Sequence, residues 1–200
     1  MREFVCEECG SSFTLPAHVM DRYPGWTPRQ CLACRDAARS GEEPNKPGSG
    51  ATDGAGAGPS TGVFTDGGAS PNPGPGGWGV VWVRENEIVD ERWGSAPDTT
   101  NNRMELTALI EAADMVPADE PAVIYADSSL SINIVTKWAA GWEQRGWKRK
   151  TGPVENLDLV RKAFYAYRAR PELELRWIKG HSGARWNDYA DELANRWRSV

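Results

Sequence analysis

The spacing of hydrophobic and polar positions divides residues 61–200 into short strand-like stretches and longer stretches with helical periodicity. Strands are predicted over 62–66, 78–84, 88–93, 122–126 and 173–178. Helices are predicted over 102–115, 130–139, 154–169 and 187–198. A Gly/Pro-rich turn is expected over 67–77. The resulting order, βββαβααβα, predicts an α/β fold in which a five-stranded mixed sheet is flanked by helices.

The composition changes twice before this domain begins. Residues 1–39 contain all four cysteines, whereas residues 40–60 are rich in Gly, Pro, Ser and Ala and contain no large apolar side chain. Such a composition is typical of a flexible linker, because it offers little to bury. We therefore expect a small module over 1–39, a linker over 40–60 and the main domain over 61–200.

The cysteines form two pairs, Cys6-x-x-Cys9 and Cys31-x-x-Cys34, which are separated by 21 residues. Two such pairs can place four thiolates tetrahedrally around one structural Zn²⁺. The alternatives are disulfides, which a reducing cytoplasm disfavours, and a thioredoxin-like redox motif, which lacks its βαβ context here. The module resembles a zinc ribbon, a class too broad to identify its partner.

Charge and hydropathy narrow the function classes. The formal net charge is −5, which argues against non-specific, charge-driven binding of nucleic acid. The negative net charge is compatible with a metal site made of acidic residues and with basic residues clustered elsewhere. No apolar run approaches the length of a membrane span, and the first residues do not resemble a secretory signal. We therefore expect a cytoplasmic protein that does not enter a membrane.

Four acidic residues occupy positions that such a sheet could bring together. Asp66 is expected to end the first strand and Asp127 to follow the strand over 122–126. Glu105 and Asp191 are expected in the first turns of two helices. Clustered carboxylates repel one another, and divalent cations such as Mg²⁺ remove that penalty. Two such ions can stabilise the attacking and leaving oxygens of a phosphoryl displacement.

Each acidic residue also has a structural interpretation. Asp66-Gly67 is an ordinary turn dipeptide, and Asn102 and Glu105 have the spacing of a capping box. Asp127 could cap the next helix, and Asp191 could be an exposed helical residue. Taken singly, these interpretations are preferred to a metal site, and spacing alone does not decide between them.

Four longer motifs stand out along the second domain: FTDGGASPNPGPGGWG (64–79), TTNNRMEL (99–106), YADSS (125–129) and KGHSGARWNDYADELA (179–194). They resemble the signatures of the type 1 ribonuclease H family. They occur in the family's order, and the similarity extends from about residue 63 to residue 197. The resemblance implies a ribonuclease H-like fold and an endonuclease that hydrolyses the RNA strand of RNA–DNA hybrids. The expected products carry 5′-phosphate and 3′-hydroxyl ends.

The resemblance also implies a site. Asp66, Glu105, Asp127 and Asp191 would bind two Mg²⁺ ions together with the substrate, with Mn²⁺ as an alternative metal. His181 would assist proton transfer or product departure from a loop with Gly180 and Gly183 on either side, a task that suits imidazole because it titrates near neutral pH. Without the resemblance, His181 would be taken for a surface residue.

Substrate contacts are expected in two places. Asn72, Asn101 and Asn102 lie in the matching motifs, and an amide side chain can donate to and accept from a 2′-hydroxyl or a base edge. Turn and cap chemistry is the alternative for these asparagines. The segment 137–150 carries a net charge of +4, with tryptophans interleaved. In the family this segment is the basic handle that grips the DNA strand. Its expected contact residues are Trp138, Trp142, Trp147, Lys148, Arg149 and Lys150.

Two features of these motifs differ from many relatives. Glu143 and Gln144 dilute the charge of the basic segment, and Ser129 stands where relatives often carry a larger polar side chain. Competing functions are a transposase or integrase core, a 3′–5′ exonuclease, and a catalytically silent hybrid-binding module. The asparagines, the basic segment and the complete set of four carboxylates favour hybrid cleavage. We expect the catalytic domain to be a monomer.

Overall fold

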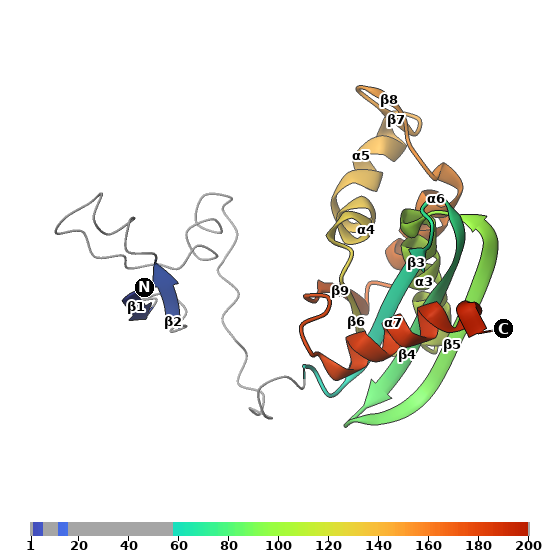
Figure 1. Ribbon diagram of the computed structural model, residues 1–200. Helices are drawn as coiled ribbons and strands as arrows, with labels where there is room; N and C mark the ends of the chain where they lie inside the picture. The colour runs from blue at the N-terminus through green and yellow to red at the C-terminus, as the bar shows by residue number, and fades with distance from the viewer. Residues whose placement is uncertain (1, 6–11, 16–57, 200) are drawn as a thin grey trace. The chain divides into compact units, whose positions relative to one another are not determined.

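The computed structural model describes residues 2–5, 12–15 and 58–199 (Figure 1). The chain divides into two compact units, Met1–Thr52 and Asp53–Val200. In the first, strands β1 (Arg2–Val5) and β2 (Ser12–Leu15) pair antiparallel. The predicted zinc ligands Cys6, Cys9, Cys31 and Cys34 lie outside the described residues, as does most of the predicted linker.

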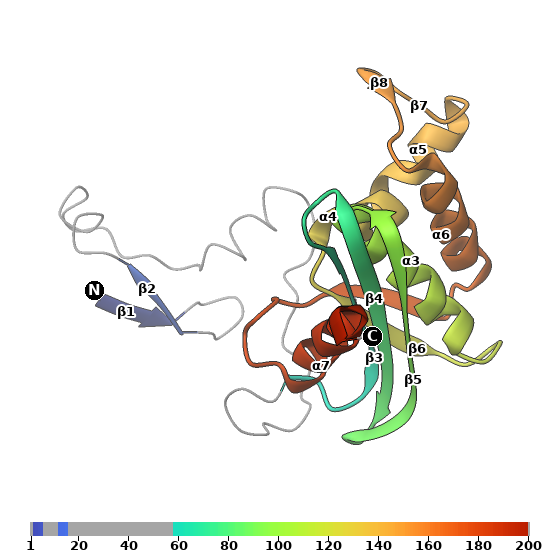
Figure 2. The ribbon, with the colours of Figure 1, turned by 45° about the vertical axis from the view of Figure 1, so that its right-hand side comes forward.

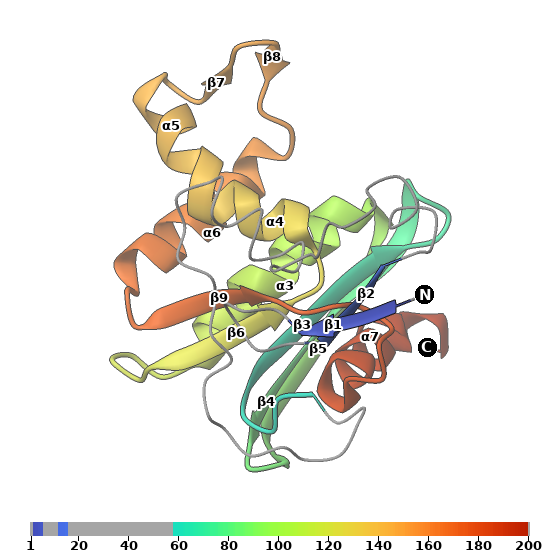
Figure 3. The same cartoon turned by 90° about the vertical axis from the view of Figure 1, so that its left-hand side faces the viewer.

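The second unit is built on a five-stranded mixed sheet, as predicted, with the strand order β5-β4-β3-β6-β9 (Figures 1 and 3). Strands β3, β4 and β5 pair antiparallel, whereas β6 and β9 continue the sheet parallel to β3. The strands are β3 (Gly62–Ala69), β4 (Gly74–Arg84), β5 (Glu87–Thr99), β6 (Ala122–Ala126) and β9 (Leu173–Trp177).

Helices cover both faces of this sheet (Figure 2). One face carries α3 (Asn101–Met115), α6 (Leu157–Ala169) and a helical segment made of α4 (Ser129–Asn133), the π-helical turn η1 (Ile134–Trp138) and α5 (Ala139–Gln144). The other face carries α7 (Arg185–Asn195), which the 3₁₀ turn η2 (Arg196–Ser199) follows. A small hairpin of β7 (Lys148–Arg149) and β8 (Gly152–Pro153) projects beyond α5.

The alternation of side chains along β3 supplies both halves of the core. Val63 packs with α3 and α6 on one face, and Phe64 packs with α7 on the other. Both side chains are fully buried. Successive residues of a strand point to opposite faces, so Asp66 shares the face of Phe64, which α7 covers. The same alternation directs Gly67 toward α3.

The predicted turn over 67–77 is wrong in extent. β3 continues to Ala69 and β4 begins at Gly74, so only four residues connect them. Two of the glycines serve helix packing instead of a turn. A methyl group on Gly67 would collide with the backbone of α3, and one on Gly77 would lie 2.6 Å from a carbonyl oxygen of α7. Glycine is needed at these two strand positions because helix backbones approach closely.

Several predicted boundaries also shift. α3 begins at Asn101, so Glu105 lies in its second turn, and Asp191 is the seventh residue of α7. Helical structure continues through η1 and α5 into the basic segment, beyond residue 139, where the predicted helix ends. Within the described part of the chain, no helix has both the length and the apolarity that crossing a bilayer requires.

The close approach at Gly67 leads to a stability prediction. Gly67→Ala must push β3 and α3 apart, and overpacking of this kind costs roughly 1–3 kcal/mol. Gly68→Ala is the matched control, because a methyl group there meets no atom within 4 Å. Urea unfolding of the two variants should therefore show a lower midpoint for Gly67→Ala alone. Equal midpoints would contradict the close approach of β3 and α3.

Candidate active site

Asp66 lies in the middle of the central strand β3, opposite Gly79 of β4. The backbone amide of Gly67 donates to its Oδ1 atom over 2.7 Å. Its carboxyl group also shares a hydrogen bond with Asp191 of α7. Asp66 is therefore a strand residue that faces a helix, and the turn interpretation of Asp66-Gly67 is excluded.

Glu105 reaches the same region from α3, on the opposite side of the sheet from α7. The hydroxyl groups of Ser128 and Ser131 both donate to its Oε2 atom, Ser131 over 2.9 Å. The N-cap of α3 is Thr100, whose hydroxyl accepts from the amide of Arg103, so Asn102 and Glu105 do not form a capping box. Glu105 thus has no capping role and is held by the serines at the start of α4.

Asp127 directly follows β6 and lies against the loop after β9. The indole Nε1 of Trp177 donates to its carbonyl oxygen over 3.0 Å, and the side chain of Asn187 hydrogen-bonds to its carboxylate. A methyl group on Gly180 would collide with that carboxylate, so the loop backbone comes very close. The cap of α4 is Ser128, not Asp127. Asp127 is therefore positioned by three separate segments.

Asp191 projects from α7. Residues before and after Asp191 form hydrogen bonds that connect the helix to the sheet. Asn195 donates to the Oδ1 atom of Asp191 over 2.9 Å. Tyr189 donates to Glu91 of β5 over 2.6 Å, and Arg196 donates to the same carboxylate over 3.0 Å. These bonds hold the helix across the sheet whose central strand carries Asp66.

The acidic side chains act on one another electrostatically. Burial, with the charges of Asp127 and Asp191 and the hydrogen bond to Asp191, raises the pKa of Asp66 from 3.8 to about 8. Burial also raises the pKa of Glu105 and that of Asp127. The serine hydroxyls oppose the pKa shift at Glu105, and Asn187 opposes it at Asp127. The cluster is therefore short of positive charge.

A divalent cation fits this donor set by its chemistry. Carboxylate oxygens are the ligands that Mg²⁺ prefers, and a cation would relieve the repulsion that raises the pKa of Asp66. Residues 58–199 contain no group of three or more His, Cys, Asp or Glu side chains already arranged around a metal position. Ligation by three or more of these carboxylates therefore requires some of the side chains to rotate toward a common metal position. A small pocket lies among three of the four carboxylates and is lined by Thr65, Asp66, Glu105, Ala126, Asp127, Ser128 and Ser131.

His181 lies in the loop that touches Asp127. Its side chain is exposed, and its backbone adopts a left-handed conformation with φ of 49°. Its positive charge, when protonated, lowers the pKa of Asp127. The loop thus brings an imidazole within electrostatic range of the carboxylates, and its part in proton transfer stays a prediction.

The three asparagines gather around the β3–β4 turn and the start of α3. The Oδ1 atom of Asn101 accepts from the amide of Ala69 over 2.7 Å, and that of Asn72 accepts from the amide of Asn101 over 3.2 Å. These carbonyl oxygens have structural partners. Asn72 is exposed, and Asn101 and Asn102 are half-buried. Substrate contacts by the three side chains stay predictions.

The tryptophans of the basic segment differ in exposure. Trp147 packs edge-on against Phe164 and Tyr165 of α6, and Trp142 packs against the core. Packing accounts for both rings without a ligand. Trp138 is 41% exposed and is the tryptophan of the three with most surface to offer. Lys148, Arg149 and Lys150 lie at the β7–β8 hairpin, where Arg149 also pairs with Glu155.

Sequence reasoning missed the residues that hold the carboxylates. Ser131 and Asn187 are almost fully buried, at 0% and 2% exposure, and each bonds to an acidic side chain. The signal that could have found them was a polar residue at an inward position of an amphipathic helix. Asn187 also stands one helical turn before Asp191. Trp177 gave no such signal, because nothing in the sequence separates its indole from those of the other tryptophans.

The fold and the site together define a class of enzyme. A mixed sheet whose central strand and both flanking helical layers contribute carboxylates to one cluster is typical of metal-dependent phosphoryl-transfer enzymes. Comparison with known proteins narrows the class. The family model described as RNase H matches residues 59–199, and the chain belongs to the ribonuclease H family.

Individual relatives agree with this assignment. Ribonuclease H of Mycolicibacterium smegmatis is 48% identical over 136 residues, which cover 67% of this chain and 84% of that protein. Ribonuclease H of Gluconobacter oxydans is 43% identical over 141 residues, covering 68% and 90%. The family match covers the second unit and does not extend over the cysteine pairs, since it begins at residue 59.

Solved structures resemble the same unit. LC9-RNase H1, a type 1 RNase H with the type 2 active-site motif, is 36% identical with a TM-score of 0.53, over 68% of this chain and 71% of that one. LC11-RNase H1, solved in complex with an RNA/DNA hybrid, is 30% identical with a TM-score of 0.51, over 67% and 93%. A foamy viral protease–reverse transcriptase, 20% identical with a TM-score of 0.60 over 68% and 92%, shares the fold.

The raised pKa of Asp66 makes the stability of the metal-free protein depend on pH. Between the ordinary value of 3.8 and the folded value of about 8, the folded chain holds a proton that the unfolded chain has released. The free energy of unfolding therefore falls as the pH rises through this window. Asp66→Asn has no charge to bury, so it should be more stable than wild type at about pH 8, by about 1 kcal/mol or more, since one pKa unit corresponds to about 1.4 kcal/mol.

Urea unfolding in EDTA at about pH 5 and about pH 8 measures this difference, which should widen with pH. Asp98→Asn, the same substitution at an exposed residue of β5, is the control and should behave as wild type at both values. A wild type whose stability rises between these pH values relative to Asp66→Asn would contradict the assigned burial of Asp66.

Proposed function

We propose that this protein is an endonuclease that hydrolyses the RNA strand of RNA–DNA hybrids. The observation that carries the proposal is the cluster formed by Asp66, Glu105, Asp127 and Asp191, which strands β3 and β6 and helices on both faces bring to one place. Membership of the ribonuclease H family supports the reaction, and the hybrid in the LC11-RNase H1 complex supports the substrate.

The four carboxylates would hold divalent metal, two Mg²⁺ ions when substrate is bound, with Mn²⁺ as an alternative. The metal supplies Lewis-acid chemistry at the phosphate when bound. The chain itself orients the ligands: the serine hydroxyls hold Glu105, and Asn187 and Trp177 hold Asp127. Water attacks the phosphorus and the 3′-oxygen departs, which leaves 5′-phosphate and 3′-hydroxyl ends. His181, near Asp127, would move a proton at the departing oxygen.

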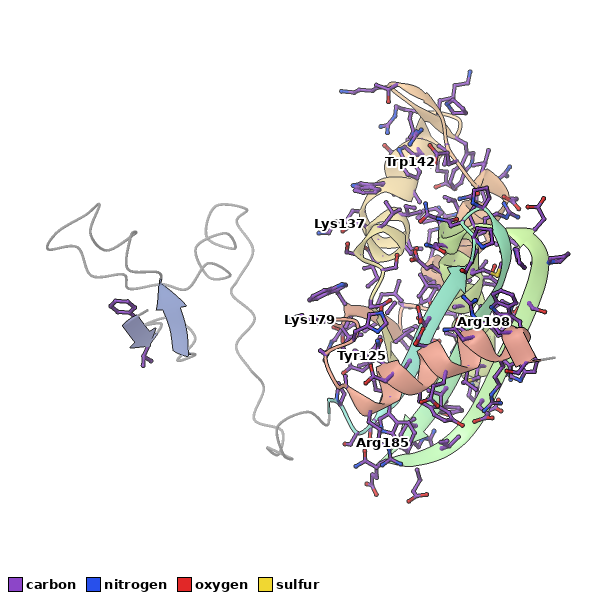
Figure 4. All side chains as sticks on the ribbon, viewed as in Figure 1. Tyr125, Lys137, Trp142, Lys179, Arg185 and Arg198 are labelled. Carbon is purple, nitrogen blue, oxygen red and sulfur yellow. The ribbon has the colours of Figure 1, made fainter. Side chains whose placement is uncertain are left out.

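Substrate binding is assigned to the side of the domain that carries the basic segment. Lys137, beside the exposed Trp138, and Lys179, before His181, lie on the same side of the catalytic unit in Figure 4. The β7–β8 hairpin adds Lys148, Arg149 and Lys150. Phosphate contacts from these cations would hold the DNA strand, and Asn72, Asn101 and Asn102 would read the minor groove of the hybrid near the carboxylates.

The N-terminal module is proposed to be a separate zinc-binding unit. Its four cysteines have the spacing of a structural Zn²⁺ site, and the chain divides into two compact units before the family match begins. The division that we propose is a zinc-ribbon-like module over 1–39, a linker over 40–60 and the catalytic domain over 61–200.

Cleavage assays on matched RNA–DNA, DNA–DNA and RNA–RNA duplexes test the main proposal. The wild type should cut only the RNA strand of the hybrid in Mg²⁺. Asp66→Asn should lose nearly all turnover while binding the hybrid as before, since it keeps the volume but removes a ligand charge. Cleavage of duplex DNA would instead favour a transposase, integrase or exonuclease, and turnover by Asp66→Asn near the wild-type rate would exclude the carboxylate assignment.

The basic segment is tested by salt dependence. Changing Lys148, Arg149 and Lys150 together to Ala should weaken hybrid binding and flatten the plot of log affinity against log salt, by roughly 0.9 for each phosphate-binding cation removed, the value for duplex DNA. Turnover at saturating hybrid should change little, because these residues lie away from the carboxylates. An unchanged slope would show that they are only a solvated surface.

Metal analysis and truncation test the N-terminal module. The full chain should contain one Zn²⁺, which is released when Cys6 and Cys9 are changed to Ser. A protein that begins at Thr61 should fold, contain no zinc and keep its saturated rate, with any deficit confined to affinity, because a tethered module acts through effective concentration. Zinc in the truncated protein, or a collapsed rate, would contradict the proposed division.

A further inference from the structure

Ser131 lies at an inward position of α4 and is fully buried. It is one of four buried polar residues in the described part of the chain, with Thr65, Thr99 and Asn187. Burying a hydroxyl group without a partner costs about 1–3 kcal/mol in proteins. An apolar residue would avoid that cost at this position, and its neighbours Ile132, Ile134 and Val135 are apolar and buried.

The hydroxyl group of Ser131 is directed at an acidic side chain. It donates to Oε2 of Glu105, on the neighbouring helix α3, over 2.9 Å. Two threonine hydroxyls in the same helical layer behave differently. Thr107 donates to the carbonyl of Arg103, and Thr136 donates to the carbonyl of Ile132, each four residues back. The Ser131 hydrogen bond therefore serves the acidic residue and not the local helix.

Ser128 completes the arrangement. Its hydroxyl donates to the same Oε2 atom and accepts from the backbone amide of Ser131 over 3.3 Å. Two donors on one oxygen fix the rotation of the carboxylate of Glu105. Its other oxygen, Oε1, keeps its lone pairs for a further partner.

We propose that Ser131 is a positioning residue that orients the carboxylate of Glu105 for binding a divalent cation. This inference rests on the proposed function, in which Glu105 is a metal ligand. A ligand whose rotation is already fixed loses less freedom when the metal binds, and the bond to one oxygen leaves the other free. Partners of metal ligands typically contribute 10–100-fold to metal affinity or activity.

An increase in metal affinity on loss of the Ser131 hydroxyl would have a different physical cause. If the two hydroxyls held Glu105 away from the metal position, binding would have to break their bonds, and removing one hydroxyl would tighten metal binding. The sign of the change in metal affinity therefore decides whether Ser131 prepares the ligand or withholds it.

The test uses the full-length protein with Ser131→Ala, Ser131→Thr and the control Thr107→Ala. Thr107→Ala removes a hydroxyl from the helix that carries Glu105 without touching its carboxylate. Binding of Mn²⁺ to the protein without substrate is followed by electron paramagnetic resonance. The Mg²⁺ concentration that gives half-maximal hybrid cleavage is measured separately.

For Ser131→Ala we expect Mn²⁺ affinity to fall about 10-fold and the Mg²⁺ midpoint to rise by a similar factor, the low end for such partners. Hybrid affinity in EDTA should stay near wild type, because no metal is bound there. Ser131→Thr keeps the hydroxyl and should restore metal affinity, and Thr107→Ala should match wild type. If Ser131→Ala does not fold, Ser131→Cys removes most of the donor strength with little change of volume.

Unchanged or tighter Mn²⁺ binding by folded Ser131→Ala or Ser131→Cys would overturn the inference, as would equal weakening in Ser131→Ala and Thr107→Ala. Failure of the proposed function looks different. In that case the wild-type protein itself would not cleave the hybrid, or Asp66→Asn would cleave it as well as wild type.

Discussion

Repulsion among buried carboxylates is the constraint on which the arrangement of the catalytic unit depends. Asp66 lies close to Asp127 and Asp191 in a partly desolvated place, and its raised pKa reflects the cost of ionising it there. A fold can hold such a cluster only if the surrounding packing resists its expansion. The two apolar cores, one on each face of the sheet, supply that resistance.

The same constraint explains the polar residues around the cluster. Ser128 and Ser131 donate to Glu105, and Asn187 bonds to Asp127, so two of the acidic side chains have neutral donors that favour the charged form. Neutral donors orient a carboxylate without neutralising it, whereas a lysine or arginine in the same place would compete with a metal ion. The cluster thus keeps its net charge for divalent metal, which the ribonuclease H family uses.

Much of the fold followed from the sequence because its apolar periods are clean. Val63 and Phe64 in the predicted strand over 62–66, and Leu106 and Leu109 in the predicted helix over 102–115, are all buried. The glycine-rich stretch after Asp66 was misjudged, because glycine signals either a turn or a close helix contact, and one sequence does not distinguish them. The need for glycine at position 67 comes from α3, which follows it by more than thirty residues in the chain.

The candidate site was predicted through motifs and not through spacing. Taken singly, the acidic residues Asp66, Glu105 and Asp127 were open to interpretation as turn or cap residues. The structure excludes these interpretations, because Asp66 is a paired strand residue and the actual helix caps are Thr100 and Ser128. An inward polar position singles out Ser131 and Asn187 in the sequence, but it does not reveal their role, because that role depends on a partner in another element. The cysteine pairs remain a prediction from spacing alone.

The bonds from α7 to β5 have a mechanical consequence. Tyr189 and Arg196 hold Glu91 from positions on either side of Asp191, so the helix is anchored to the sheet before and after that carboxylate. Both bonds end on the carboxylate of Glu91, so moving this part of the helix away from β5 would break both of them. Tilting α7 would require breaking a charged hydrogen bond, which contributes about 1.5–3 kcal/mol. The distance between Asp191 and the central strand is thereby set partly at the outer edge of the sheet, by a strand that contributes no acidic residue to the cluster.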